Sequence, residues 1–347
     1  MSSPVVAVAL SGGIDSLVSG FLIKKAYKEV FGIHFTTGYE SMPVDTHAIE
    51  SQLGFPIHIL DLSSVFEKEV VSYFTSTYLS GKTPNPCLVC NQKIKFGALL
   101  SHALDLGADA LATGHYARVH NGFSVTNMDE TCPWLEKGVD LNKDQSYFLA
   151  RLGCSQLAKS IFPLGSMDKP RVRKIAHDQG LVPVIPSESQ DICFIREKNF
   201  AQFINDKQGI SPLPGPVMDI TGKQVGTHNG LHTFTIGQRR GINIPASEPY
   251  YVRGICMADN TLHVCFKKDL GQKEMEVDQI IWNHPRTETC HDLITKIRYA
   301  HKGAASVLTR TGQRGKVKFN TPQNAVTPGQ AAVFYRDNRV LGAGIIQ

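Results

Sequence analysis

The sequence predicts an α/β protein: a parallel β-sheet with a glycine-rich loop, then a small central domain, then a C-terminal β-barrel. Three observations support this order. The apolar run 5–10 leads directly into residues 11–13, Ser-Gly-Gly, and then into a helical pattern. Strand-like and helical runs alternate over residues 30–78, as they do in parallel sheets. From about residue 275 the pattern becomes short strands with period-two alternation, which is typical of small barrels.

The expected elements follow the chain in order. Strands are predicted at residues 5–10, 30–35, 57–60, 108–112, 316–319, 332–335 and 340–346, with a hairpin turn at 337–338. Helices are predicted from residue 15, at 47–53, at 66–78, from residue 93, near residue 170 and at 200–207. Residues 83–86, Thr-Pro-Asn-Pro, are excluded from helix because proline constrains both itself and the preceding residue. We therefore expect domains at 1–198, 199–272 (α+β) and 273–347 (β-barrel).

The glycine loop has the features of an anion site. Two adjacent glycines, Gly12 and Gly13, permit a tight turn, and Asp15 and Ser16 are residues that begin helices well. A helix N-terminus directs free N–H groups and the positive end of its dipole at one point, where a phosphate binds. The loop is not a Walker A motif, because no Lys follows the glycines, and it does not match GxGxxG. An ordinary strand-to-helix turn is the alternative.

The composition is that of an ordinary globular chain. Its 347 residues suffice for two or three domains, and a charged content of 19% excludes neither enzymes nor binding proteins. No apolar run approaches the ~20 residues of a membrane helix, and the N-terminus lacks the pattern of a secretory signal. We therefore expect a cytoplasmic protein without membrane contact. Its eight cysteines are expected to start as thiols, so that a disulfide would be transient and catalytic.

The net charge of +5 is unevenly distributed. Residues 271–347 hold 11 Lys and Arg but 6 Asp and Glu, whereas residues 1–270 hold 25 of each kind. The basic excess therefore lies in the C-terminal stretch, which predicts a polyanionic partner held partly by that stretch. A basic surface that serves solubility explains the same count. Arg239 and Arg240, in GQRRGI, either hold a nucleic-acid phosphate or form an exposed turn.

Cysteines and one histidine are the other candidate functional residues. Cys87 and Cys90 form a C-x-x-C pair followed by lysines, which fits half a zinc site, a redox pair or part of an iron–sulfur site. The nearby lysines favour the thiolate form and hence reactivity. No second C-x-x-C follows, which argues against structural zinc. Cys193 lies in an apolar run and His115 ends a predicted strand, so each is either functional or structural.

Eight segments of the sequence carry a resemblance to one family. They are SGGIDS (11–16), GKTPNPCLVCNQKIKFGALL (81–100), ATGHYAR (112–118), NKDQSYFL (142–149), FPLG followed by KPRVRKIA (162–176), DICFI (191–195), GQRRGI (237–242) and VTPGQAAVFY (326–335). In this order they resemble the tRNA-specific 2-thiouridylase (MnmA-type) family of PP-loop ATP pyrophosphatases. The resemblance implies an adenine-nucleotide alpha hydrolase-like fold for the N-terminal domain.

The resemblance implies thiolation at C2 of the wobble uridine (U34) of certain tRNAs. ATP, with Mg²⁺, would adenylate the uridine O2, and a cysteine persulfide charged by a sulfur-donor protein would then deliver sulfur. Cys90 matches the catalytic nucleophile and Cys193 the persulfide carrier, while Asp15 is the expected metal partner. Residues expected at ATP are Ala9, Leu10, Ser11, Gly12, Gly13, Ile14, Asp15, Ser16, Phe35 and Gly114. Residues expected at tRNA are Asn85, Pro86, Cys87, His115, Lys143, Asp144, Gln145, Arg298, Tyr299 and Gln330.

The chain departs from the family pattern at two places. Well-known members carry Asp where this chain has Cys87, and the segment after Phe35 is shorter here than in many relatives. The additional thiol allows a second chemistry, in which Cys87, Cys90 and Cys193 hold a [4Fe–4S] cluster whose fourth iron binds the transferred sulfur. Two other functions are alternatives: an amide-forming PP-loop ligase, although no glutaminase domain is visible, and a tRNA-binding protein without catalysis.

Overall fold

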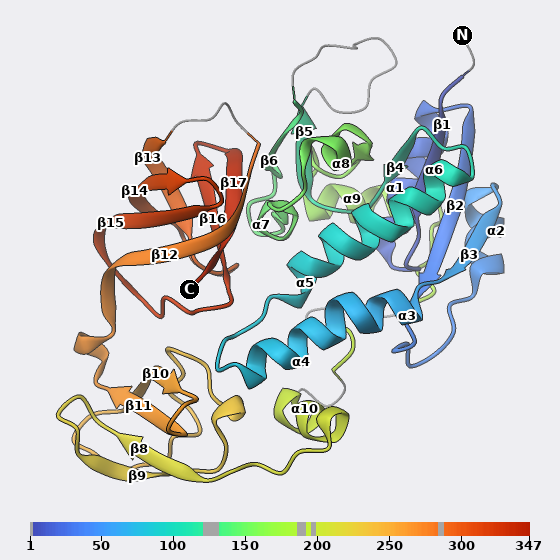
Figure 1. Cartoon of the computed structure of the whole chain (residues 1–347). Helices are drawn as coiled ribbons and strands as arrows, with labels where there is room; N and C mark the ends of the chain where they lie inside the picture. The colour runs from blue at the N-terminus through green and yellow to red at the C-terminus, as the bar shows by residue number, and fades with distance from the viewer. Residues whose placement is uncertain (1–2, 121–131, 186–191, 196–198, 284–287) are drawn as a thin grey trace.

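A five-stranded parallel sheet forms the centre of the N-terminal part (Figure 1). The computed structural model describes residues 3–120, 132–185, 192–195, 199–283 and 288–347. The strands, in spatial order, are β3 (Ile57–Asp61), β2 (Glu29–Thr36), β1 (Val5–Ala9), β4 (Ala110–Ala112) and β7 (Ser160–Ile161). The chain runs from β1 outward to β3 and then crosses to β4 and β7 on the other side of β1. Ligands bind at such a switch of direction, beyond the carboxyl ends of the strands.

Helices cover both faces of this sheet. On one face lie α1 (Ile14–Ala26), α2 (Thr46–Leu53) and α9 (Lys169–Asp178). On the other lie α3 (Ser63–Phe66), the π-helix η1 (Glu67–Val71) and α4 (Ser72–Leu79), beside α5 (Pro86–Val89), the π-helix η2 (Cys90–Leu99) and α6 (Leu100–Asp105). Val6 and Val8 of β1 belong to the first core and Ala7 to the second, as expected for a strand buried on both faces. Short helices α7 (Ser146–Leu149) and α8 (Cys154–Ala158) follow.

The remaining strands form two further sheets. Helix α10 (Phe200–Gln208) leads into a central sheet ordered β10 (Tyr251–Cys256), β11 (Thr261–Cys265), β8 (Gly215–Met218) and β9 (Gln224–His228). The barrel strands are β12 (Gly271–Trp282), β13 (Thr289–Lys296), β14 (Ala304–Thr311), β15 (Arg314–Asn324), β16 (Ala331–Arg336) and β17 (Arg339–Ile346). Strand β12 pairs with both β15 and β17, which closes the barrel. Within the described ranges, no helix has the length and apolar character needed to cross a membrane.

The barrel and the N-terminal part share a β-sheet and an apolar core. Strand β17 pairs with β6 (Trp134–Lys137), which pairs with β5 (Ala117–His120), so two strands of the N-terminal part extend the barrel sheet (Figure 1). Ala331 and Val333 of the barrel lie in the same apolar core as Phe74 of α4. Removing the barrel would therefore expose part of the core of the N-terminal part.

The predicted fold class is confirmed, with a parallel sheet first and a closed barrel last. The exclusion of Pro86 from helix is wrong, because Pro86 is the first residue of α5. Proline suits this position, where the backbone N–H has no helical partner. Asn85 caps the helix by accepting a hydrogen bond from Leu88 N–H through Oδ1 at 3.2 Å. The helix expected from Lys93 therefore begins seven residues earlier.

A disulfide joins Cys132 to Cys154. The expectation that every cysteine starts as a thiol is therefore wrong for this pair. The bond ties the residue two positions before β6 to the first residue of α8, so it crosslinks structural elements. By contrast, Cys90 and Cys193, the predicted nucleophile and the predicted persulfide carrier, carry free thiols in this structure.

Candidate active site

The loop between β1 and α1 presents backbone N–H groups at the switch of sheet direction. Gly13 caps α1 and has no side chain with which to accept hydrogen bonds from the first turn. Gly12 has φ of 84°, which favours glycine, and a Cβ there would lie 2.6 Å from Val184 Cγ2. Because α1 has 13 residues and no side-chain cap, its N-terminus suits a phosphate group.

Asp15 carries a negative charge in the first turn of α1. Lys169 Nζ lies 2.8 Å from both of its carboxylate oxygens, and the Tyr116 hydroxyl donates to Oδ1 at 2.7 Å. The Lys169 side chain is only 6% exposed, so the ion pair is shielded on the lysine side. A carboxylate offers about four lone-pair positions, so these three contacts leave room for one more. Asp15 therefore fits the predicted role of metal partner, since Mg²⁺ prefers oxygen ligands.

The other residues predicted at ATP lie around this loop. Phe35 lies near the carboxyl end of β2 and Gly114 follows β4, so both are at the edge of the sheet that carries the loop. Gly114 approaches the loop closely, since a Cβ there would lie 3.0 Å from the Asp15 carbonyl carbon. His34 Nδ1 is 2.9 Å from the carbonyl oxygen of Leu10. The structure thus brings the predicted ATP residues, 9–16, 35 and 114, to one edge of the sheet.

Three free cysteines, Cys87, Cys90 and Cys193, form a second group that we call the cysteine site. Burial is the main reason that the pKa of Cys90 rises to about 12; Lys95 opposes this rise, whereas Cys193 and Cys87 add to it. Surrounding protein atoms also raise the pKa of Cys87 and of Cys193, although both side chains keep an exposed face. The three predicted thiols are therefore within electrostatic range of one another, although about a hundred residues separate Cys90 from Cys193.

Phe194 attaches Cys193 to the protein core. Its ring is 2% exposed, and its centroid lies 5.7 Å from that of Phe66, 5.2 Å from that of Phe74 and 5.4 Å from that of Phe203. These edge-on and tilted contacts are the arrangements that aromatic rings prefer. The apolar neighbour of Cys193 is therefore an anchor, while the cysteine itself is exposed.

His115 lies between the loop and the cysteine site, directly after Gly114. Its Nδ1 is 2.7 Å from Thr113 Oγ1, and its Nε2 is 3.4 Å from Lys95 Nζ. Burial, and then the charge of Lys95, lower the pKa of His115 well below its usual value, so the ring is neutral. An ammonium only donates, so Nε2 is the acceptor and Nδ1 donates to Thr113. His115 is 7% exposed and holds Lys95 here, while its contact with tRNA stays a prediction.

The barrel holds the segment that precedes α5. Gln330 Nε2 donates to the carbonyl oxygens of Thr83 at 3.2 Å and Pro84 at 2.8 Å. Gly329 has φ of 89°, and a Cβ there would lie 2.7 Å from the Thr83 carbonyl oxygen. Gln330, predicted at tRNA, therefore positions the loop that leads to Asn85, which is itself 6% exposed.

Two more of the residues predicted at tRNA are engaged within the protein. Asp144, 6% exposed, accepts hydrogen bonds from the N–H groups of Gly138 and Ser146, each at 3.0 Å. Gln145 Oε1 accepts from Tyr116 N–H at 2.9 Å. These side chains shape the loop that carries Lys143.

Arg298 and Tyr299 differ from these residues, since both are exposed. The Tyr299 ring is 39% exposed and its centroid lies 4.6 Å from that of Phe148. Lys296 Nζ lies 5.6 Å from the centre of the same ring. Burial raises the pKa of the Tyr299 hydroxyl, and the charge of the half-buried Lys143 opposes this rise. An exposed aromatic ring among cations suits both base stacking and phosphate contact.

Two residues of the site, Tyr116 and Lys169, are absent from the sequence-based prediction, whereas Lys95 is one of the lysines that were expected to favour the thiolate form. Lys95 approaches His115, whereas Tyr116 and Lys169 bind Asp15. All three lie inside segments that carry the family resemblance, which is the signal that could have found Tyr116 and Lys169. Their partners are 20 to 154 residues away in sequence, so no local pattern pairs them.

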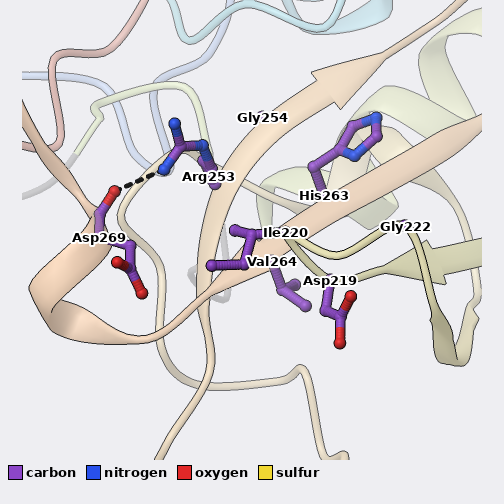
Figure 2. A pocket seen from close by; sticks show the side chains of 8 residues that line it. All are labelled: Asp219, Ile220, Gly222, Arg253, Gly254, His263, Val264 and Asp269. Atoms are coloured by element: carbon purple, nitrogen blue, oxygen red, sulfur yellow. Dashed lines mark hydrogen bonds between the residues drawn. The ribbon is translucent and has the colours of Figure 1, made fainter.

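The central domain also has a cavity of about 620 Å³. Figure 2 shows the side chains that line it. Its lining residues are Asp219, Ile220, Gly222, Arg253, Gly254, His263, Val264 and Asp269. Arg253 Nη1 donates to the Asp269 carbonyl oxygen at 2.6 Å, and Asp219 Oδ1 accepts from Thr221 N–H at 2.8 Å. The charged groups of the cavity are thus partly satisfied by its own walls, and no predicted site residue lines it.

Comparison with known proteins gives matches along the whole chain. Residues 4–197 match the family described as tRNA methyl transferase HUP domain, 201–266 the tRNA methyl transferase PRC-barrel domain, and 272–346 the Aminomethyltransferase beta-barrel domain. The tRNA-specific 2-thiouridylase MnmA of Desulfosudis oleivorans is 48% identical over 100% of this chain and 96% of its own length. The tRNA-specific 2-thiouridylase MnmA 2 of Syntrophus aciditrophicus is 40% identical over 91% of this chain and 98% of its own.

Proposed function

The chain belongs to the tRNA-specific 2-thiouridylase family, and we propose that it makes 2-thiouridine at the wobble position (U34) of tRNA. One observation carries this proposal: the phosphate-binding loop adjoins the cysteine site through Gly114 and His115. An activating nucleotide and a sulfur carrier are then within reach of one uridine. We assign the chemistry to residues 1–198 and tRNA contacts partly to the barrel, 273–347, with residues 199–272 between them.

Activation of the uridine is the first step. The N-terminus of α1 binds the phosphates of ATP, while Phe35 and Gly114 line the adenosine. The uridine O2 attacks the α-phosphorus, pyrophosphate leaves, and the N3 proton is released. Lys169 and the positive end of α1 stabilise the negative charge that develops on the phosphates. When bound at Asp15, Mg²⁺ would supply further neutralisation of pyrophosphate charge.

Sulfur transfer is the second step. Cys193 carries a persulfide loaded by a sulfur-donor protein. Burial raises the pKa of Cys90 to about 12, so its thiol passes its proton to the outer persulfide sulfur as it attacks Cys193 Sγ. The persulfide S–S bond breaks, a Cys90–Cys193 disulfide forms, and hydrosulfide leaves; two electrons pass from the cysteine sulfurs to the departing sulfur. Hydrosulfide then attacks C2 of the adenylated uridine, AMP leaves, and the hydrogen of hydrosulfide moves to N3. A dithiol reductant returns Cys90 and Cys193 to thiols.

Cys87 supports the alternative chemistry through an iron–sulfur cluster. In the described part of the chain, no three His, Cys, Asp or Glu side chains are close enough to hold a single metal ion. A cubane cluster spaces its ligands more widely than one ion does, and cysteine thiolates are its normal ligands. The three thiols are of the ligand type that such a cluster needs and would be its protein ligands; when bound, the cluster would supply an open iron for sulfur.

A Cys87→Asp variant separates the two chemistries. We expect it to thiolate tRNA nearly as fast as wild type, because in the persulfide route Cys87 only lines the position of the target base. Wild type purified without oxygen should then contain neither iron nor acid-labile sulfide. If wild type instead binds about four irons per chain, and Cys87→Asp loses both the irons and activity, the cluster route replaces the persulfide route.

Binding of tRNA should weaken steeply as salt concentration rises, because phosphate contacts release counterions. Arg298→Gln is expected to weaken binding and to reduce the slope of log affinity against log salt by about 1. Arg314→Gln, an exposed arginine at the start of β15, is the matched control and should leave the slope unchanged. Filter binding over a salt series measures both. Equal slopes for wild type and Arg298→Gln would remove Arg298 from the tRNA interface.

The decisive experiment supplies the protein with unmodified tRNA, ATP, Mg²⁺ and a persulfide donor, then digests the tRNA for nucleoside mass spectrometry. We expect 2-thiouridine, with one AMP and one pyrophosphate formed for each. A tRNA-binding protein without catalysis would release no AMP. An amide-forming ligase would release AMP with ammonia or glutamine and incorporate no sulfur. A cytoplasmic location, where tRNA and dithiol reductants are present, is part of the proposal.

A further inference from the structure

Lys95 is a cation without a carboxylate partner beside the cysteine site. Its ammonium contacts the neutral ring of His115 at 3.4 Å, and its side chain is half-buried. Among the residues that the structure describes, no Asp or Glu forms an ion pair with it. Glu40 is the carboxylate whose charge adds to the raised pKa of Cys193. The Glu40 oxygens accept hydrogen bonds from Thr37 and Gly38. A half-buried cation with no carboxylate partner is available to an anion that occupies the site itself.

The helical register explains why Lys95 lies there. Residues 90–99 form a π-helix, in which Leu100 N–H bonds to the Lys95 carbonyl oxygen five residues earlier. In an α-helix, with ~3.6 residues per turn, residue 95 would lie about 140° around the axis from residue 90. The wider turn of a π-helix brings residue 95 closer to the face that carries residue 90. The π-helix therefore brings Lys95 toward the side of Cys90, and His115 fixes the end of its side chain.

The charge of Lys95 reaches all three thiols of the cysteine site. Burial raises the pKa of Cys87, Cys90 and Cys193, and the charge of Lys95 opposes this rise in each case. We propose that Lys95 is a positioning residue for sulfur transfer, whose ammonium, held by His115, binds the sulfur anion that occupies the cysteine site. The anion is a thiolate or persulfide, and the proposal rests on the function proposed above.

The test compares the rates at which anionic iodoacetate and neutral iodoacetamide alkylate Cys90 and Cys193 in the full-length protein, read by peptide mass spectrometry. Both reagents react with the same thiolate, so the ratio of their rates cancels the thiolate fraction and reports the local charge. In Lys95→Met the ratio should fall roughly threefold to tenfold, the effect of one unit charge a few ångströms away. Lys95→Arg keeps the charge and should keep the ratio. Lys93→Met, an exposed lysine of the same helix, is the matched control.

Turnover supplies a second measurement. Formation of 2-thiouridine should fall much more in Lys95→Met than tRNA-dependent AMP release does. The proposal is overturned if Lys95→Met keeps the alkylation ratio of the wild type. It is also overturned if the alkylation ratio falls as far in Lys95→Arg as in Lys95→Met. A loss of AMP release with an unchanged ratio overturns it as well, and would assign the cation to a phosphate.

The wild-type protein also tests the proposal without any substitution. Its alkylation ratio should fall as ionic strength rises, because salt screens the charge of Lys95; a ratio independent of salt contradicts the proposal even if Lys95→Met fails to fold. Alkylation needs neither tRNA nor ATP. A wild-type protein that makes no 2-thiouridine but shows the Lys95-dependent ratio would therefore refute the proposed function while leaving the role of Lys95 as an anion-binding group intact.

Discussion

Asp15→Asn is expected to abolish tRNA-dependent release of AMP while leaving tRNA affinity nearly unchanged. The substitution keeps the shape of the side chain but removes the charge that balances Lys169 and would bind Mg²⁺. Loss of one preorganised charge at a reacting phosphate lowers the rate by roughly a hundredfold or more. Binding of tRNA is proposed to depend on dispersed contacts elsewhere, such as the one predicted for Arg298, so it should persist. The measurement is release of labelled AMP, with filter binding of tRNA on the same preparation.

Asp178→Asn is the matched control for this experiment. Asp178 also pairs with a lysine of α9, Lys174 at 3.0 Å, but both side chains are largely exposed. Such surface pairs contribute little, so AMP release should equal that of wild type. Asp15→Ala tests the role more severely, because it also removes the hydrogen bond from Tyr116. Normal AMP release by Asp15→Asn would refute the assignment of the loop to nucleotide activation.

The sequence predicted the parts of the site that are local in the chain. The strand, two glycines and helix start of residues 5–16 are contiguous, and their order dictates an anion site because free N–H groups must point beyond the helix end. The C-x-x-C pair was equally visible. Its helix was predicted to begin too late, because the rule against proline in helices does not apply to the first helical position, which Pro86 occupies.

What joins distant segments could not be predicted in the same way. Lys169 reaches Asp15 across 154 residues, and Gln330 reaches Pro84 across 246. Neither pairing can be recognised from the periodicity or composition of the sequence, because each depends on how the sheet and barrel are placed in space. The disulfide between Cys132 and Cys154 is similar: no spacing rule distinguishes this pair among eight cysteines.

The tRNA residues show a related limit. A sequence motif marks positions of one loop but not which side chains face outward. Asp144 in the NKDQ segment accepts backbone hydrogen bonds inside the protein, whereas Lys143 next to it reaches the neighbourhood of Tyr299. The roles predicted for Asp144 and Gln330 stay predictions, but their geometry favours support of the tRNA-facing loops. Arg298 and Tyr299, exposed on the barrel, are the better candidates for direct contact.

Cys193→Ser is expected to stop 2-thiouridine formation while tRNA-dependent AMP release continues. The hydroxyl of serine cannot carry a persulfide, and the phosphate-binding loop does not depend on this side chain. Thiolation should fall by more than about a hundredfold, the scale for loss of an essential nucleophile. The serine is nearly isosteric, and Phe194 should still anchor the turn, so the fold is expected to persist. Nucleoside mass spectrometry and AMP release, measured in one reaction, separate the two steps.

Cys90→Ser completes the argument. It should also stop thiolation, but a persulfide should now accumulate on Cys193, because the thiol that attacks Cys193 Sγ is absent. Peptide mass spectrometry would detect Cys193 with one additional sulfur atom. Cys256→Ser, a free and half-buried cysteine of the central domain, is the control and should retain both activities. If Cys193→Ser still thiolates tRNA at the wild-type rate, sulfur does not pass through Cys193. If Cys90→Ser accumulates no persulfide although wild type can be loaded, Cys90 is needed before the transfer step and not as its nucleophile.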